Sequence, residues 1–130
     1  SAIPRDGDDD DTDTIDYTAT SPVSVGNSGT AQFKLTVRWP NDLDQVQVTI
    51  VLPATVTLGT PSISPAQTGQ SINTQGDRAI FTHSKAHTGD TITYSLPFTA
   101  DTAGSYAVTF KVDADELVDV VSRQVSLVLQ

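Results

Sequence analysis

Apolar and polar residues alternate along most of this 130-residue chain. Phe33, Leu35 and Val37 fall on one face of an extended segment, and the polar residues between them fall on the other. A period of two is the signature of a strand with one face buried and one face in water. The pattern therefore predicts a β-strand over this part of the chain.

The same alternation recurs, with turn-forming residues between the repeats. The predicted strands include residues 15–19, 33–39, 46–52, 56–58, 79–81, 92–98, 106–112 and 125–129. Residues 59–77, rich in Gly, Pro, Ser, Gln and Thr, are expected to form a long connection. No long window has helical spacing, and residues 115–121 could form one turn at most. The chain is expected to be all-β, an immunoglobulin-like antiparallel sandwich of seven or eight strands.

A single core between two sheets follows from the shared phase of the apolar residues within each strand. The residues expected to form this core are Phe33, Leu35, Val37, Val48, Ile50, Ile92, Leu96, Tyr106, Val108, Phe110 and Leu127. A chain of this length can bury roughly two-thirds of its unfolded surface, so the core needs no covalent staple.

Residues 1–13 differ from the rest, because six Asp fall between positions 6 and 13. Like charges at this density repel one another and oppose folding of the isolated segment. We therefore divide the chain into an extended acidic segment, residues 1–13, and a sandwich, residues 14–130.

Composition excludes several classes of function. The net charge is −9, and a nucleic-acid-binding domain would instead need a basic face. No apolar run approaches the roughly 20 residues of a membrane span, so membrane insertion is not expected. The chain contains no cysteine, which excludes disulfides, thiol catalysis and cysteine-based metal sites.

Two acidic clusters are candidate calcium sites, because calcium binds six to eight oxygen ligands in flexible geometry. The first comprises Asp6, Asp8, Asp10 and Asp13 of the acidic segment, whose spacing does not fit an EF-hand; the alternative is a solvated tail. The second comprises Asp113, Asp115, Glu116 and Asp119, expected in the loop before the last strand; the alternative is an ordinary polar turn.

No catalytic constellation is evident, and the chain is not expected to be an enzyme. His83 and His87 are its only histidines and are expected in a solvated loop, with a metal site as the less favoured interpretation. There is no Gly-x-Ser-x-Gly motif and no phosphate-binding glycine loop. With one Trp and three Tyr that alternate with apolar residues, an aromatic sugar platform is also disfavoured.

Residues 97–115 carry the most recognisable sequence motif in the chain, and residues 26–37 and 43–56 carry weaker ones. These segments resemble prokaryotic immunoglobulin-like surface domains of the CARDB type and the conserved-repeat domains of surface-layer proteins. Within it, Asp101 and Tyr106 match the tyrosine-corner pattern, in which the Tyr hydroxyl bonds to backbone just upstream. The resemblance implies a structural role at the cell surface or outside the cell.

Two functional hypotheses remain open. The first is a non-catalytic extracellular protein that assembles with copies of itself or with other surface proteins into a filament, sheath or surface layer. In this hypothesis the N-terminal segment contacts the neighbouring subunit, with calcium as a stabilising cofactor. The second is an adhesion or glycan-binding module of a larger cell-surface protein.

Overall fold

The computed structural model describes residues 15–38, 40–117 and 120–130. These residues form ten β-strands, and the described part of the chain contains no helix that could cross a membrane. The strands are β1 (Ile15–Ala19), β2 (Ser28–Thr36), β3 (Leu43–Val51), β4 (Val56–Leu58), β5 (Ser62–Ser64), β6 (Ser71–Gln75), β7 (Arg78–Ala86), β8 (Thr91–Ala100), β9 (Gly104–Asp113) and β10 (Val121–Leu129).

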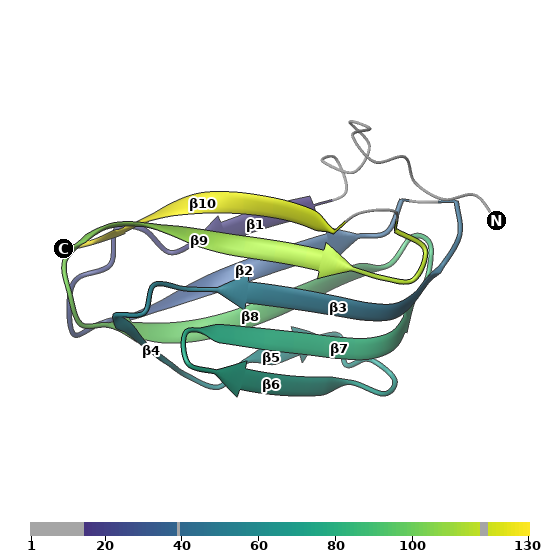
Figure 1. Ribbon diagram of the computed structural model, residues 1–130, viewed down its shortest axis with the longest axis horizontal. Helices are drawn as coiled ribbons and strands as arrows, with labels where there is room; N and C mark the ends of the chain where they lie inside the picture. The colour runs from purple at the N-terminus through teal and green to yellow at the C-terminus, as the bar shows by residue number, and fades with distance from the viewer. Residues whose placement is uncertain (1–14, 39, 118–119) are drawn as a thin grey trace.

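The strands form two antiparallel sheets that stack as a sandwich (Figure 1). The first sheet has the order β1-β2-β8-β4, and β5 also pairs with β8. The second has the order β10-β9-β3-β7-β6. The groups β1-β2-β8 and β10-β9-β3 correspond to the A-B-E and G-F-C strands of immunoglobulin-like sandwiches. This confirms the predicted fold class.

The core lies between the sheets and consists of the inward side chains of each strand. All the predicted core residues are buried except Tyr106, which is half-buried against the core. Five aromatic side chains are fully buried in it: Phe33, Phe81, Tyr94, Phe98 and Phe110. Phe33 and Phe110 meet across the two sheets with 5.8 Å between ring centroids.

Two strands lie where the sequence predicted a connection. β5 and β6 fall within residues 59–77, so that part of the prediction was wrong. Each strand directs one apolar side chain inward, Ile63 and Ile72 respectively, which is too little for a visible alternation. β7 is also longer than predicted, because polar residues continue it to Ala86.

The chain changes sheets soon after β1. β1 pairs with β2, but Val23 forms a parallel bridge to Leu129 in β10 of the other sheet. The Val23 N–H donates to the Val128 carbonyl at 2.9 Å, and the Gln130 N–H donates to the Val23 carbonyl at 2.8 Å. Val23 is 4% exposed, so this crossing anchors the start of the chain to both sheets.

Gln45 breaks the alternation of β3. Its φ of 54° lies in the left-handed region, which few non-glycine residues adopt. Leu43 and Val46 lie on either side of it, three positions apart, and both are buried. The backbone conformation of Gln45 therefore lets both Leu43 and Val46 face the core, although they are an odd number of residues apart in β3.

Candidate functional site

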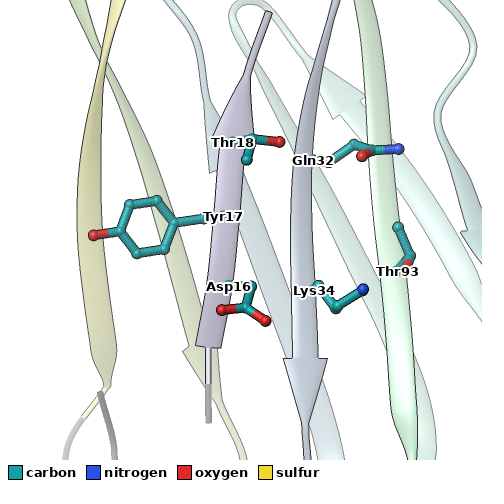
Figure 2. A pocket seen from close by; sticks show the side chains of 6 residues that line it. All are labelled: Asp16, Tyr17, Thr18, Gln32, Lys34 and Thr93. Atoms are coloured by element: carbon teal, nitrogen blue, oxygen red, sulfur yellow. The ribbon is translucent and has the colours of Figure 1, made fainter. Parts of the chain in front are cut away.

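The outer face of the sheet formed by β1, β2 and β8 carries an open hollow of about 360 Å³. Figure 2 shows Asp16 and Thr18 from β1, Gln32 and Lys34 from β2, and Thr93 from β8 gathered on this face. Alternation places these residues outward because their neighbours in each strand face the core. The hollow therefore belongs to the sheet itself, whose hydrogen-bonded strands hold it in place.

The register of the strands sets the order of polar groups across the hollow. Asp16 lies opposite Lys34 in the β1–β2 pair, and Lys34 lies opposite Thr93 in the β2–β8 pair. Figure 2 shows the Lys34 amine directed away from the Asp16 carboxylate and toward β8. The Gln32 amide donates to the Ser95 hydroxyl at 3.2 Å, which steadies the Gln32 side chain.

Tyr17 forms one wall of the hollow and points away from the polar group (Figure 2). Its ring is half-buried and packs against Phe110, with 5.7 Å between ring centroids. Tyr17 therefore serves the core and does not present an open aromatic platform. The accessible groups of the hollow are the Lys34 cation, the Asp16 anion, the Gln32 amide and the threonine hydroxyls. These groups can form hydrogen bonds to an uncharged polar ligand.

A second hollow of about 240 Å³ lies on the outer face of the other sheet. Its lining includes Gln47 and Thr49 of β3, Arg78 and Ile80 of β7, and Lys111 and Asp113 of β9. The side-chain nitrogen Nε of Arg78 lies 3.8 Å from Asp77, and the Asp113 carboxylate accepts from the Ala114 N–H at 2.9 Å. Its size and position make it a natural control for the first hollow.

One end of the sandwich gathers charged side chains around Asp42. The Asp42 carboxylate accepts hydrogen bonds from the Thr88 N–H at 2.9 Å and from the His87 ring at 3.0 Å. Asp90 accepts from the His87 N–H at 2.9 Å, which closes the turn between β7 and β8. The Thr88 backbone bond, followed by the His87 side chain, lowers the pKa of Asp42. These contacts tie the β2–β3 loop to the β7–β8 turn.

Asp44 organises a second set of contacts at the same end. Its carboxylate pairs with Lys85 at 2.7 Å, and this bond lowers the pKa of Asp44 and raises that of Lys85. The Glu116 carboxylate accepts from the Asp44 N–H at 2.6 Å, and the Asp44 carbonyl accepts from the Asp115 N–H at 2.9 Å. Asp44 thus joins β3 to the β9–β10 loop.

The predicted metal ligands do not form a cation site within the described part of the chain. Asp113 and Glu116 accept the backbone hydrogen bonds given above, and no group of three acidic or histidine side chains converges among the residues described. Asp6, Asp8, Asp10, Asp13 and Asp119 lie outside the described residues. The acidic segment 1–13 lies outside them as well, so calcium binding stays a prediction.

Tyr106 lies near the start of β9 with its ring over Gly104. Its hydroxyl donates to the Ala103 carbonyl at 3.3 Å, within the stretch where the tyrosine-corner pattern places such a bond. A Cβ at Gly104 would come within 3.0 Å of the Tyr106 ring, and the φ of 149° at this position is one that residues with a side chain rarely adopt, so glycine is favoured here. Tyr106 is half-buried where burial was expected, and Asp101 is exposed in the turn before β9.

His83 does not lie in a solvated loop, so that prediction was wrong for this residue. It lies in β7, is 3% exposed, and its Nε2 is 2.6 Å from the Tyr94 hydroxyl. Burial lowers the pKa of His83. His87 does lie in an exposed turn, with 63% of its side chain accessible.

Sequence reasoning missed the hollow between β1, β2 and β8. The sequence shows its residues only as the polar side of alternating strands, and nothing in it indicates that β8 lies next to β2. The useful signal was the polar face of residues 32–38 next to a first strand carrying Asp16 and Thr18.

Comparisons with known proteins support the fold. No family model and no curated protein matches the chain in sequence, so the resemblance to CARDB domains stays a prediction. Three solved structures illustrate the similarity of fold. The C-terminal domain of the Streptococcus agalactiae AgI/II polypeptide BspA has a TM-score of 0.69 at 10% identity, covering 88% of this chain and 49% of that one.

The second is the full-length major pilin SpaD of Corynebacterium diphtheriae, with a TM-score of 0.65 at 13% identity over 85% of this chain and 33% of that chain. The third is a collagen-binding domain from a Staphylococcus aureus adhesin. It has a TM-score of 0.60 at 8% identity, and the match covers 86% of this chain and 96% of that chain. This chain spans about half of the BspA domain structure and about a third of the pilin. At these identities the similarity establishes a shared sandwich fold.

Proposed function

We propose that this chain is a non-catalytic adhesion module of an extracellular, cell-surface protein. The hollow on the outer face of β1, β2 and β8 is its contact surface. This hollow is the observation that carries the proposal, because it presents hydrogen-bonding groups on a rigid sheet and its one cation and one anion balance. The similarity of fold to a collagen-binding domain of an adhesin supports the same role.

The chemistry of the hollow favours a hydrated, uncharged polymer such as a glycan. Hydroxyl and amide groups can both donate and accept, and a sugar offers the same groups in return. No open aromatic ring among the described residues lines the hollow to stack on a sugar, because Tyr17 is turned into the core. Affinity for one site is therefore expected to be weak and to rise when several copies of the module act together.

Binding of the intact protein to an immobilised glycan array tests this proposal. The triple substitution Gln32→Ala, Lys34→Ala and Thr93→Ala removes polar groups from the hollow and leaves the core untouched. For every glycan that the natural chain binds on the array, we expect the affinity of the triple variant to be at least tenfold lower. Its melting temperature should differ from that of the natural chain by no more than a few degrees.

The second hollow provides the matched control. Gln47→Ala with Lys111→Ala removes an amide and a cation from the second hollow, so it matches the loss of Gln32 and Lys34 but on the opposite sheet. We expect this variant to bind like the natural chain. Equal losses in both variants, or no glycan bound at all, would contradict the assignment of the contact surface.

Self-assembly is a second candidate, favoured by the way β1 is attached. β1 pairs with β2 alone and stands at the end of the first sheet. Its register runs from Ile15 opposite Leu35 to Ala19 opposite Ala31, and the Thr20 N–H extends the pairing to the Thr30 carbonyl at 2.9 Å. The first bond to β10 is made by Ser21, whose hydroxyl accepts from the Val128 N–H at 2.9 Å. β1 could therefore leave its own sheet and pair with β2 of a neighbouring copy while Ser21 and Val23 stay bonded to the end of β10. The fold kinship with a major pilin supports this candidate.

An engineered disulfide tests strand exchange cleanly, because the chain has no cysteine of its own. Thr18→Cys with Gln32→Cys joins register partners and would lock β1 to β2 within one chain. Thr109→Cys with Gln124→Cys is the matched control, because it joins β9 to β10 and leaves β1 free.

Electron microscopy and light scattering would follow assembly of both variants, oxidised and reduced. If β1 is exchanged, oxidation of the variant that locks β1 to β2 prevents assembly and its reduction restores it, while the control assembles in both states. Deleting residues 1–13 is expected to leave the sandwich folded and to abolish assembly. Assembly of the locked form, or a strictly monomeric protein at high concentration with calcium, would exclude this candidate.

A further inference from the structure

His83 and Tyr94 form a buried hydrogen bond between the two sheets. His83 lies in β7 of the second sheet and Tyr94 in β8 of the first, and they are 3% and 0% exposed. The His83 Nε2 and the Tyr94 oxygen are 2.6 Å apart, and the rings stack at 13° with 5.8 Å between centroids. The pair therefore connects the layers by a polar contact inside an apolar core.

The partners of His83 determine where its proton lies. The His83 Nδ1 is 3.2 Å from the Lys85 carbonyl oxygen, which can only accept, so Nδ1 carries the hydrogen. Nε2 then has a lone pair, and the Tyr94 hydroxyl donates to it. Neutral His83 thus has both ring nitrogens satisfied, and the Tyr94 hydrogen has an acceptor.

A second proton on His83 destroys this match. Nε2 becomes a donor, so the Tyr94 hydroxyl must turn and accept, and its own hydrogen loses the acceptor it had. A positive charge would also be placed in the core, where its hydration is lost. An unsatisfied buried donor and a buried charge both weaken the folded state.

The elements around His83 offer no compensating negative charge among the described residues. β3 places Val46 opposite His83, and β6 contains no ionisable residue. The nearest charged pair in the register is Asp44 with Lys85, whose charges neutralise each other at 2.7 Å. Burial lowers the pKa of His83, and the Lys85 carbonyl opposes this only in part.

We propose that the His83–Tyr94 contact is a pH-sensitive clasp, which holds the two sheets together while His83 is neutral and loosens them when the medium becomes acidic. In the unfolded chain a histidine titrates near 6.5. Below that pH, His83 binds a second proton in the unfolded chain but not in the folded chain. The stability that neutral His83 contributes is fully present above about pH 6.5 and is lost as the pH falls toward the pKa of His83 in the folded chain. Over that range the unfolding constant rises by up to about tenfold per pH unit.

Nuclear magnetic resonance of the intact protein measures the titration directly, because the chain has only two histidines. The variant His87→Gln assigns the two imidazole signals. We expect His83 to be protonated at Nδ1 at neutral pH and to titrate with a midpoint below 6.5. A midpoint at or above 6.5, or protonation at Nε2, would overturn the proposal.

Equilibrium unfolding between pH 4.5 and 7.5 supplies the second readout. The double variant His83→Leu with Tyr94→Phe replaces both polar partners with apolar groups of similar size, so it leaves no orphaned hydroxyl. We expect its unfolding constant to change less with pH than that of the natural chain. An identical pH dependence in the double variant and the natural chain would also overturn the proposal. If the double variant does not fold, the resonance titration of the natural chain decides alone.

Discussion

Replacing Phe110 with alanine tests whether the two sheets share one core. Phe110 lies in β9 and is fully buried, 5.8 Å from Phe33 of the other sheet and 5.7 Å from Tyr17 of β1, measured between ring centroids. The truncation removes a whole phenyl ring and leaves a cavity lined by both sheets. A change of this kind costs about 3–5 kcal/mol, the sum of lost burial and an unfilled cavity.

We expect the upper part of that range, because each lost aromatic pair adds about 0.5–1.5 kcal/mol beyond burial. Natural domains are stable by about 5–15 kcal/mol, so the variant will be close to unfolding. Phe110→Leu retains much of the volume and is expected to cost about 1–2 kcal/mol, which keeps the measurement within range.

Urea unfolding at neutral pH is the assay, with the midpoint compared at constant slope. Lys111→Ala is the control, because the next residue of β9 points to the opposite face and is exposed. It is expected to change stability by at most about 0.5 kcal/mol. A loss below about 1 kcal/mol for Phe110→Ala, or a similar loss for both variants, would refute the packing described here.

Three further changes have expected outcomes. Tyr106→Phe removes the bond to the Ala103 carbonyl and should cost about 1 kcal/mol in urea unfolding; no loss would mean that the bond contributes nothing. Because the pKa of Asp42 is lowered, its contribution to stability is present above about pH 3.8 and lost below it, so melting curves of Asp42→Asn should lack that acid-dependent loss. Calorimetry at millimolar calcium should show binding that disappears when residues 1–13 are deleted; no heat, with a melting temperature indifferent to chelator, would contradict calcium binding.

The alternation in the sequence was enough to predict most of the fold. Inward residues such as Val48 and Ile50 were identified because a strand with one buried face must repeat every two residues. β5 and β6 were missed because each contributes a single inward side chain, Ile63 or Ile72. Their strand conformation comes from pairing with β8 and β7, which a local pattern does not reveal.

The candidate site was largely beyond sequence reasoning for a related reason. Asp16 and Thr93 are far apart in the chain and meet only because β2 lies between β1 and β8. The burial of His83 likewise depends on Tyr94 in the opposite sheet. The alternation of polar and apolar residues tells which face a side chain occupies, but not which strands will be its neighbours.

The same alternation explains how a sandwich can carry different functions on one core. Lys34 projects from β2 between Phe33 and Leu35, which are fully buried, so its side chain can change while the packing beneath it stays the same. The order of the strands then decides which outward residues share a surface. Cores tolerate hydrophobic exchange when volume and pattern are kept, so sandwiches of very different sequence retain one fold. Function must therefore be sought in the outward residues of neighbouring strands, and the contact surface that we propose is formed by those of β1, β2 and β8.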